Sequence, residues 1–368
     1  MMRMTNQMGR QPTTHIVDTP SHRARTRWLA YVLSLAMCVV IGCDSSKRKD
    51  ASNDPRDATA TVGRSDGSRS DRVTLMLNWY PEAEHGGFFA AQTNGIFAKY
   101  GLDVEIRPGG ENAPVAQELV SGRVQFAIGN ADDVLLFREQ DVDVVALLAP
   151  IQQTPRCIMV RADSGVDSLS KLKGLTLQAN RGQAFLSYME QRGMLDGVQV
   201  VPYSGSIARF VADDRTAVQA YNFSEPQLAE QQGVKAKTLM LSEIGFNPYA
   251  SCLLARSDFV KSEAAICQRM TQACREGWEQ YLRDPVKANE AILERNPERM
   301  TAAALAYGAE QLKPLCQPTE ASQLGDMSAS RWDELIAQFV ELKLLTPQKV
   351  SAQSAFVSLP ASSTDRQP

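Results

Sequence analysis

The residues best suited to binding chemistry lie in one early segment, from Asn78 to Gly110. Trp79 follows an apolar strand pattern, and an indole ring at the end of a strand can stack on a flat ligand. His85 is the only histidine after residue 43, and its ring can donate or accept a hydrogen bond. The segment predicts one wall of a ligand cleft, although Trp79 could instead cover the surface and His85 could face solvent.

Glycines flank the helix that this segment predicts. Gly86 and Gly87 come directly before the apolar run at Phe88, where the N–H groups of a helix N-terminus attract partial negative charge. Because these glycines have no side chains, they would let a ligand approach the backbone closely. Gly109 repeats the pattern after the next strand, and a plain tight turn is the alternative explanation for it.

Polar residues also follow the later strands. Asn130 and Asp132 come after the third apolar strand, where either residue could cap the next helix. Asn180 lies in a strand-to-helix turn of the second half of the chain. Its amide is a further candidate for a polar contact with a solute.

An aromatic and an acidic residue, Tyr221 and Glu225, lie together at a strand end. A carboxylate that faces a cleft suits a ligand with amino or ring N–H donors. It opposes nitrate or sulfonate, because two anions repel each other in a desolvated site. Glu225 could also serve only the first turn of its own helix, where negative charge is favourable. We expect Glu225 to bind the ligand.

Apolar runs of strand length alternate with helical patterns from residue 72 to residue 241. Repeated strand–helix–strand units predict an α/β fold with two doubly wound, mostly parallel sheets covered by helices. The expected strands are 73–77, 104–106, 125–128, 144–148, 175–178, 198–203, 217–221 and 237–241. The expected helices between them are 88–100, 113–121, 132–140, 185–193, 207–213 and 225–232.

Two apolar segments, 156–161 and 250–255, have the position of crossings between two lobes. The pattern predicts a bilobal protein with two hinge crossings, in which hinge motion closes a cleft on a ligand. The predicted first lobe comprises residues 72–161 and 250–350, and the predicted second lobe comprises residues 162–249.

The N-terminus has the order of an export signal. Three arginines precede an apolar run of 15 residues, 28–42, which is shorter than the ~20 residues that span a membrane. Small and aliphatic residues lead directly into Cys43, which resembles a lipobox. The resemblance implies a signal peptide over residues 1–42 and lipid attachment at Cys43, whose acyl chains would enter a membrane. An ordinary secretory signal or an uncleaved anchor is the alternative.

Composition limits the classes of partner. Residues 43–71 have little to bury and predict a lipidated cysteine followed by a flexible tether, and residues 351–368 predict a disordered tail. Removing the five Arg and one Asp of residues 1–42 from 39 basic and 42 acidic residues leaves 34 and 41, a net charge of −7. A nucleic-acid partner would need a basic face instead. The chain has no nucleotide loop and no HExxH motif, so we predict no cofactor and no metal.

The motifs NWYP, AAQTNGIF, GLDV and PGG, with the histidine between the first two, resemble a known family. It comprises periplasmic solute-binding proteins that supply nitrate, sulfonate and thiamine-pyrimidine precursors to ABC importers, and the thiamine-pyrimidine branch is the most similar. The resemblance covers most of residues 72–259. It implies the type II periplasmic-binding-protein fold, and it implies ligand contacts in the turn that holds Asn130 and Asp132.

The resemblance also implies a function. The protein would be exported, lipid-anchored on the periplasmic side of a membrane, monomeric, and a partner of ABC permease subunits. It would capture a small-molecule solute, close around it and release it without bond chemistry. The expected solute is a pyrimidine related to thiamine. A small anion bound by the same fold, or a tethered sensor that signals to a membrane kinase, are the alternatives.

The fungal thiamine-pyrimidine synthases resemble this chain in the same segments but differ at their reactive positions. Those enzymes carry a lysine that holds pyridoxal phosphate and a histidine that is consumed as substrate, where this chain has Gly129 and Asp133. Their cysteine-rich iron-binding run corresponds to residues 247–252, which contain one cysteine. Glycine cannot form an imine, and aspartate cannot supply imidazole atoms. We therefore predict a binding protein and not an enzyme.

Overall fold

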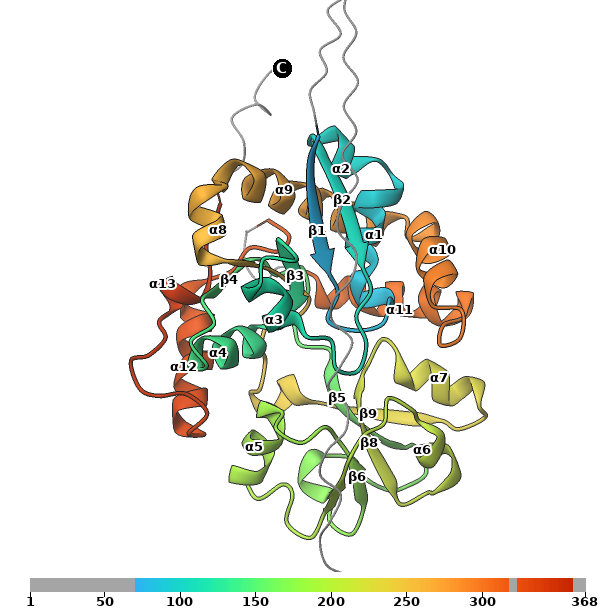
Figure 1. Cartoon of the computed structure of the whole chain (residues 1–368). Helices are drawn as coiled ribbons and strands as arrows, with labels where there is room; N and C mark the ends of the chain where they lie inside the picture. Colours follow the sequence, from blue (N-terminus) through green and yellow to red (C-terminus); the bar gives the residue numbers. More distant parts are fainter. Residues whose placement is uncertain (1–69, 318–322, 360–368) are drawn as a thin grey trace, which may run out of the picture. The chain divides into compact units, whose positions relative to one another are not determined.

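The computed structural model describes residues 70–317 and 323–359 (Figure 1). The predicted signal peptide, the lipidation site Cys43 and nearly all of the predicted tether lie outside these residues. Within the described ranges, no helix is both long enough and apolar enough to cross a membrane.

Two five-stranded sheets form the framework of the described chain. The first sheet has the order β2-β1-β3-β10-β4, in which β1 runs parallel to β2 and β3, and β10 runs antiparallel to both of its neighbours. β3, β4 and β10 are almost continuous apolar runs, as expected where helices cover both faces, whereas the edge strand β2 alternates apolar with charged residues. The strands are β1 (Asp71–Met76), β2 (Leu102–Arg107), β3 (Phe126–Gly129), β4 (Val144–Leu148) and β10 (Cys252–Arg256).

The second sheet has the order β7-β6-β8-β5-β9. Here β6 runs parallel to β7 and β8, and β5 runs antiparallel to β8 and β9. The strands are β5 (Arg156–Arg161), β6 (Thr176–Gln178), β7 (Gln199–Val201), β8 (Thr216–Tyr221) and β9 (Ala236–Met240).

Each sheet contains one strand that enters from the other half of the molecule, which corrects the prediction of mostly parallel sheets. β10 returns from the second half and β5 arrives from the first, and both run against their neighbours. The position of β5 also corrects the predicted lobe boundary, because residues 156–161 belong to the second sheet. Below, the first lobe means residues 70–149 and the described part of 250–359, and the second lobe means residues 156–246.

The crossings are the short segments that precede these two strands. Ile151 and Ala250 form an antiparallel bridge, with the amide of Ala250 donating to the carbonyl of Ile151 at 3.0 Å. From α12 (Ala329–Glu341), Arg331 donates to the carbonyl oxygens of Gln152 at 2.7 Å and Asn247 at 3.1 Å. One side chain of the first lobe therefore holds both crossings.

Helices connect and cover the strands of each sheet (Figure 1). In the first lobe they are α1 (Gly86–Thr93), α2 (Ile96–Lys99), α3 (Val115–Val120), α4 (Ala131–Glu139), α8 (Ser257–Ser262), α9 (Ala264–Arg283), α10 (Val286–Arg295), α11 (Ala302–Leu315), α12 and α13 (Ala352–Ala355). In the second lobe they are α5 (Ala184–Gln191), α6 (Ala208–Ala212) and α7 (Glu225–Gln231). Short 3₁₀ turns are η1 (Ala83–His85), η2 (Leu169–Lys171) and η3 (Leu241–Ile244).

The first predicted helix differs from the observed one at its start and in its middle. α1 begins at Gly86 rather than at Phe88, and Gly95, with a φ of 69°, separates α1 from α2. Positive φ favours glycine, so the break follows from this residue type. α9 packs against α1 and buries Trp278 and Tyr281 on one face.

The described part of the C-terminal segment is ordered against the first lobe, which corrects the predicted disorder of residues 351–359. The ring of Phe356 stacks on Trp332 with ring centroids 6.0 Å apart and an interplanar angle of 5°. The amide of Val357 donates to the carbonyl of Ala146 in β4 at 2.9 Å. Residues 360–368 of the predicted tail lie outside the described residues.

Candidate functional site

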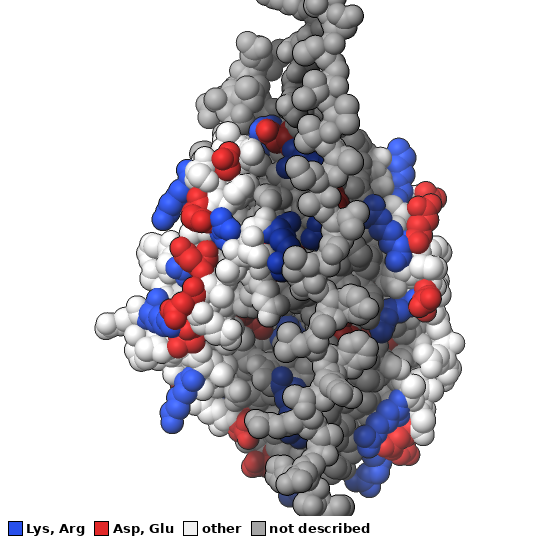
Figure 2. All heavy atoms as spheres, in the orientation of Figure 1, with Lys and Arg blue, Asp and Glu red and all other residues white. Residues whose placement is uncertain are grey.

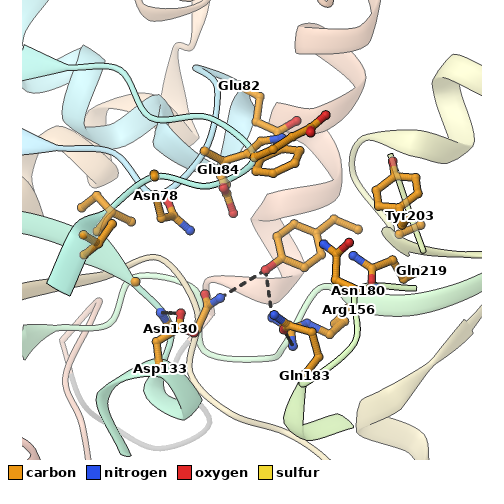
Figure 3. A pocket seen from close by; sticks show the side chains of 18 of the residues that line it. Asn78, Glu82, Glu84, Asn130, Asp133, Arg156, Asn180, Gln183, Tyr203 and Gln219 are labelled. Atoms are coloured by element: carbon orange, nitrogen blue, oxygen red, sulfur yellow. Dashed lines mark hydrogen bonds between the residues drawn. The ribbon is translucent and has the colours of Figure 1, made fainter. Parts of the chain in front are cut away.

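A cavity of ≈290 Å³ lies between the two lobes (Figure 3). It is lined by loops that follow β1, β3, β6 and β8, and by the start of the antiparallel strand β5, so several strand ends converge on this cavity. From the first lobe, its polar and aromatic lining includes Asn78, Trp79, Glu82, Glu84, Glu111, Asn130 and Asp133. From the second lobe, it includes Arg156, Asn180, Gln183, Tyr203, Gln219, Tyr221 and Glu225.

The residues that the sequence proposed for ligand binding divide into two groups. The structure brings Trp79, Asn130, Asn180, Tyr221 and Glu225 together in the cavity lining. The remaining residues lie near the cavity but are not part of its lining, and they are His85, Gly86, Gly87, Gly109 and Asp132.

Gly86 and Gly87 serve the packing of two helices. Both are buried in the first turn of α1, where a side chain on Gly86 would overlap the ring of Tyr281 and one on Gly87 would overlap the ring of Trp278. These glycines therefore let α9 approach α1 closely, which replaces the predicted reason for their presence.

Gly109 allows two loops of the first lobe to touch. Its amide donates to the carbonyl oxygen of Trp79 at 3.1 Å. A side chain at this position would collide with the backbone of Leu77 and Trp79. Gly109 therefore holds the loop of the cavity-lining Trp79 in place without itself lining the cavity.

His85 is a buried, neutral histidine that orients a neighbour. The amide of Glu82 donates to Nδ1 at 3.3 Å, so the hydrogen is carried by Nε2, which lies 3.0 Å from Oδ1 of Asn78. Burial lowers the pKa of His85 to about 3. Because Oδ1 of Asn78 is occupied, its amide nitrogen faces the cavity (Figure 3).

Hydrogen bonds cross the cavity from one lobe to the other. The hydroxyl of Tyr221 accepts from Nδ2 of Asn130 at 3.3 Å and from Nη2 of Arg156 at 3.4 Å (Figure 3). Arg156 also donates to Oδ2 of Asp132 at 3.2 Å. Asn130 additionally accepts from the amide of Ser251, a buried crossing residue with a φ of 51°. This network connects the cavity to one of the crossings, and it explains why Asp132 is buried behind Arg156.

Acidic side chains dominate the charge of the cavity. Its lining contains five carboxyl groups, Glu82, Glu84, Glu111, Asp133 and Glu225, and a single guanidinium, that of Arg156. On the visible face of the described surface, by contrast, Lys and Arg alternate with Asp and Glu (Figure 2). Within the described ranges, no group of three metal-binding side chains is arranged to hold an ion. The cavity therefore favours a solute with N–H donors or positive charge.

Burial raises the pKa of several of these carboxyl groups. Burial, and then repulsion from Glu225, raises the pKa of Glu84 to about 8. Burial, and then the charge of Asp132, raises the pKa of Asp133 to about 7. Burial likewise raises the pKa of Glu82 well above its ordinary range. The closed site is therefore less charged than its residue types suggest.

Several lining residues were not identified from the sequence. Two of them could have been found in the sequence, because Gln219 is a polar residue inside an apolar strand and Arg156 is a charged residue at the start of one. Glu82 and Glu84 were harder to find, because acidic residues in a loop are usually exposed and do not indicate a buried site. The residues missed are Asn78, Glu82, Glu84, Glu111, Asp133, Arg156, Gln183, Tyr203 and Gln219.

Comparison with known proteins identifies the family. The sequence pattern described as NMT1/THI5 like matches residues 82–288. The chain belongs to the NMT1/THI5-like family. The formylaminopyrimidine-binding protein of Halalkalibacterium halodurans is 25% identical over 306 residues, covering 80% of this chain and 92% of that protein. The 4-amino-5-hydroxymethyl-2-methylpyrimidine phosphate synthase THI11 of Saccharomyces cerevisiae is 20% identical over 247 residues, covering 62% of this chain and 72% of that enzyme.

Solved structures support the assignment of the fold. The periplasmic aliphatic sulphonate binding protein SsuA from Escherichia coli superposes with a TM-score of 0.61 at 13% identity, covering 81% of this chain and 96% of that protein. The predicted α/β periplasmic-binding-protein fold is therefore confirmed, with mixed sheets. This member of the NMT1/THI5-like family has its cavity where its two lobes meet.

Proposed function

We propose that this protein is the extracytoplasmic solute-binding component of an ABC importer and captures a thiamine-related pyrimidine of the hydroxymethyl or formylamino type. The supporting observation is the cavity between the lobes, in which Trp79 and Tyr221 provide aromatic surface among acidic groups. A flat heterocycle with amino groups matches aromatic rings and carboxyl groups, and hinge motion would close the lobes around it.

The position of the only cavity-lining guanidinium speaks against a small anion as the solute. Arg156 donates to Asp132 at 3.2 Å, to Gln183 at 3.1 Å and to Tyr221 at 3.4 Å. An anion would have to compete with Asp132 for this group, and it would enter a site rich in carboxyl groups.

The reactive positions of the synthase relatives are the reason to propose binding without catalysis. Gly129 ends β3, and a side chain there would lie 2.8 Å from Leu254, which leaves little room for a lysine. Asp133 accepts a hydrogen bond from the amide of Asn130 at 2.8 Å and so serves the start of α4. This chain therefore has neither the imine-forming amine nor the imidazole at these positions.

We also propose export, lipid attachment at Cys43, a monomeric state and delivery of the solute to ABC permease subunits. Cys43 follows an apolar run of the length of a signal peptide. Mass spectrometry of the mature protein should find an acylated N-terminal Cys43, and a free or internal Cys43 would contradict the anchoring proposal.

A thermal-shift panel tests the proposed solute. We expect hydroxymethyl- or formylamino-pyrimidines to stabilise the purified protein, and thiamine, taurine, nitrate and bicarbonate to have no effect. A ligand at 100 times its Kd adds ~2.7 kcal/mol, which corresponds to a rise in Tm of roughly 5 °C for a chain of this size. A shift with the anions alone would reassign the solute, and no shift with any compound would favour the sensor alternative.

Trp79→Ala should weaken pyrimidine binding about tenfold or more, because stacking of a base on an aromatic ring contributes ~1–3 kcal/mol. Trp79 is half-buried, so the free protein should keep its Tm. Titration calorimetry measures the change, and Trp79→Phe, which retains an aromatic face, is the matched control. Equal affinities of Trp79→Ala and the unmodified protein would refute the stacking role.

A further inference from the structure

Glu84 has a carboxylate oxygen that no described residue satisfies. Its side chain, in η1, is 1% exposed and lines the cavity. In the described part of the chain, Oε2 has no hydrogen-bond partner, whereas Oε1 lies 3.4 Å from Nε2 of His85. Figure 3 shows the carboxylate pointing into the cavity. A buried acceptor without a partner costs about 1–3 kcal/mol, so a donor that fills this place is favoured.

The other buried carboxyl groups of the lining are already occupied. Glu225, the residue that the sequence favoured, accepts from the amide of Tyr221 at 2.8 Å and from the hydroxyl of Tyr203 at 3.3 Å. Glu82 accepts from the hydroxyl of Ser224 at 2.9 Å across the lobes. Asp133 accepts from the amide of Asn130, as described above. These three carboxyl groups hold neighbouring parts of the protein in place, and among the described residues Glu84 is the buried carboxyl group of the lining with an acceptor atom available to the solute.

We propose that Glu84 selects the solute by accepting, at Oε2, a hydrogen bond from an amino or amidine N–H group of the bound heterocycle. This inference rests on the solute-binding function proposed above. It narrows the solute class to heterocycles with an N–H donor on the edge that faces η1. At a pH where Glu84 is ionised, rings whose facing edge carries only acceptors would leave Oε2 unpaired and would be rejected.

The surroundings of Glu84 explain why a donor would be bound strongly. The charged or titratable groups around it are His85, Glu82, Glu225, Asp133 and Arg156. His85 is neutral and its Nε2 hydrogen is directed at Asn78, while Arg156 is paired with Asp132, so neither neutralises Glu84 fully. A solute N–H would therefore be the donor that allows Glu84 to ionise, in a site where hydrogen bonds to charged groups are strong.

Titration calorimetry at pH 9 tests the inference, because Glu84 is then ionised and can only accept. The probes are 4-amino-5-hydroxymethyl-2-methylpyrimidine and the same compound without its amino group. We expect the unmodified protein to prefer the amino compound at least about 100-fold, because a site built for a donor rejects a ligand that lacks it. Glu84→Gln, nearly the same in shape, should reduce this preference at least tenfold.

Glu310→Gln, which changes an exposed carboxylate outside the cavity, is the matched control and should keep the preference within about threefold, while Glu225→Gln tests the neighbouring carboxyl group. Glu84→Asp is a second variant, which keeps the charge but withdraws it by one methylene and should also lower the preference. An unchanged preference in both Glu84 variants, with a loss in Glu225→Gln, would overturn the role of Glu84 and leave the proposed function intact. Failure of the unmodified protein to bind any pyrimidine of the panel would instead refute the proposed function.

Discussion

Replacing Arg156 with methionine should lower the free energy of unfolding by about 3–5 kcal/mol, the usual cost of removing one partner of a buried ion pair. Asp132 is 2% exposed, and its Oδ1 already has no partner among the described residues. Without the guanidinium, Oδ2 would lose its partner at 3.2 Å, and Tyr221 would lose one of its two donors. Urea denaturation of both proteins measures the difference.

The matched control is the double variant Arg156→Met/Asp132→Asn. An amide in place of the carboxylate removes the unpaired charge, so we expect the double variant to recover more than half of the lost stability. Separation of the lobes would hydrate Asp132 without unfolding the protein. A loss below about 1 kcal/mol together with a larger radius of gyration would therefore contradict the prediction.

The ligand-free protein should be at least about 3 kcal/mol less stable at pH 7 than at pH 5. The pKa of Glu84 is raised to about 8 and that of Asp133 to about 7 in the folded state, chiefly by burial. Between pH 5 and pH 7 the unfolded chain has released both protons and the folded chain retains them. Stability then falls with rising pH by ~1.4 kcal/mol per unit for each group.

His85 acts in the opposite direction over part of this range. Burial lowers its pKa to about 3, so below pH ~6.5 the unfolded chain binds a proton that the folded chain does not. His85 therefore favours folding as the pH rises towards 6.5, and it offsets one of the two carboxyl groups. A net excess of at least about one proton in the folded state remains, because the raised pKa of the buried Glu82 adds to it, and at least ~3 kcal/mol over two pH units follows.

Urea denaturation at pH 5, 6, 7 and 8 measures this dependence. The triple variant Glu82→Gln/Glu84→Gln/Asp133→Asn removes the strongly raised groups with little change in shape, and its stability should fall much less between pH 5 and pH 7. Equal stability of the unmodified protein at these two pH values would show that these carboxyl groups ionise normally in the fold.

The alternation of strands and helices was readable from the sequence, because apolar periodicity and glycine positions are local properties. β1, β3, β4 and β8 lie within a residue or two of their expected ranges. The two places where the chain changes lobe were predicted to within a few residues, but segment 156–161, predicted as a crossing, is the strand β5 of the second sheet. Strand pairing depends on contacts between distant parts of the chain, and hydrophobic periodicity does not predict which strands pair.

Half of the residues that the sequence proposed for ligand binding line the cavity. Trp79, Asn130, Asn180, Tyr221 and Glu225 line the cavity because loops at the carboxyl ends of strands converge at one edge of a sheet. The local sequence places such side chains at this edge of the sheet, independently of the tertiary contacts that they make.

Only the tertiary structure decided which of the polar groups remain free for a solute. Glu225 is occupied by Tyr203 and Tyr221, whereas Oε2 of Glu84 has no partner among the described residues. Gly86 proved to be a packing residue only because Tyr281, far along the chain, lies against it. Burial and hydrogen-bond occupancy depend on such distant partners, and so the sequence determined which loops line the candidate site, while the folded chain decided which of its polar groups are already paired.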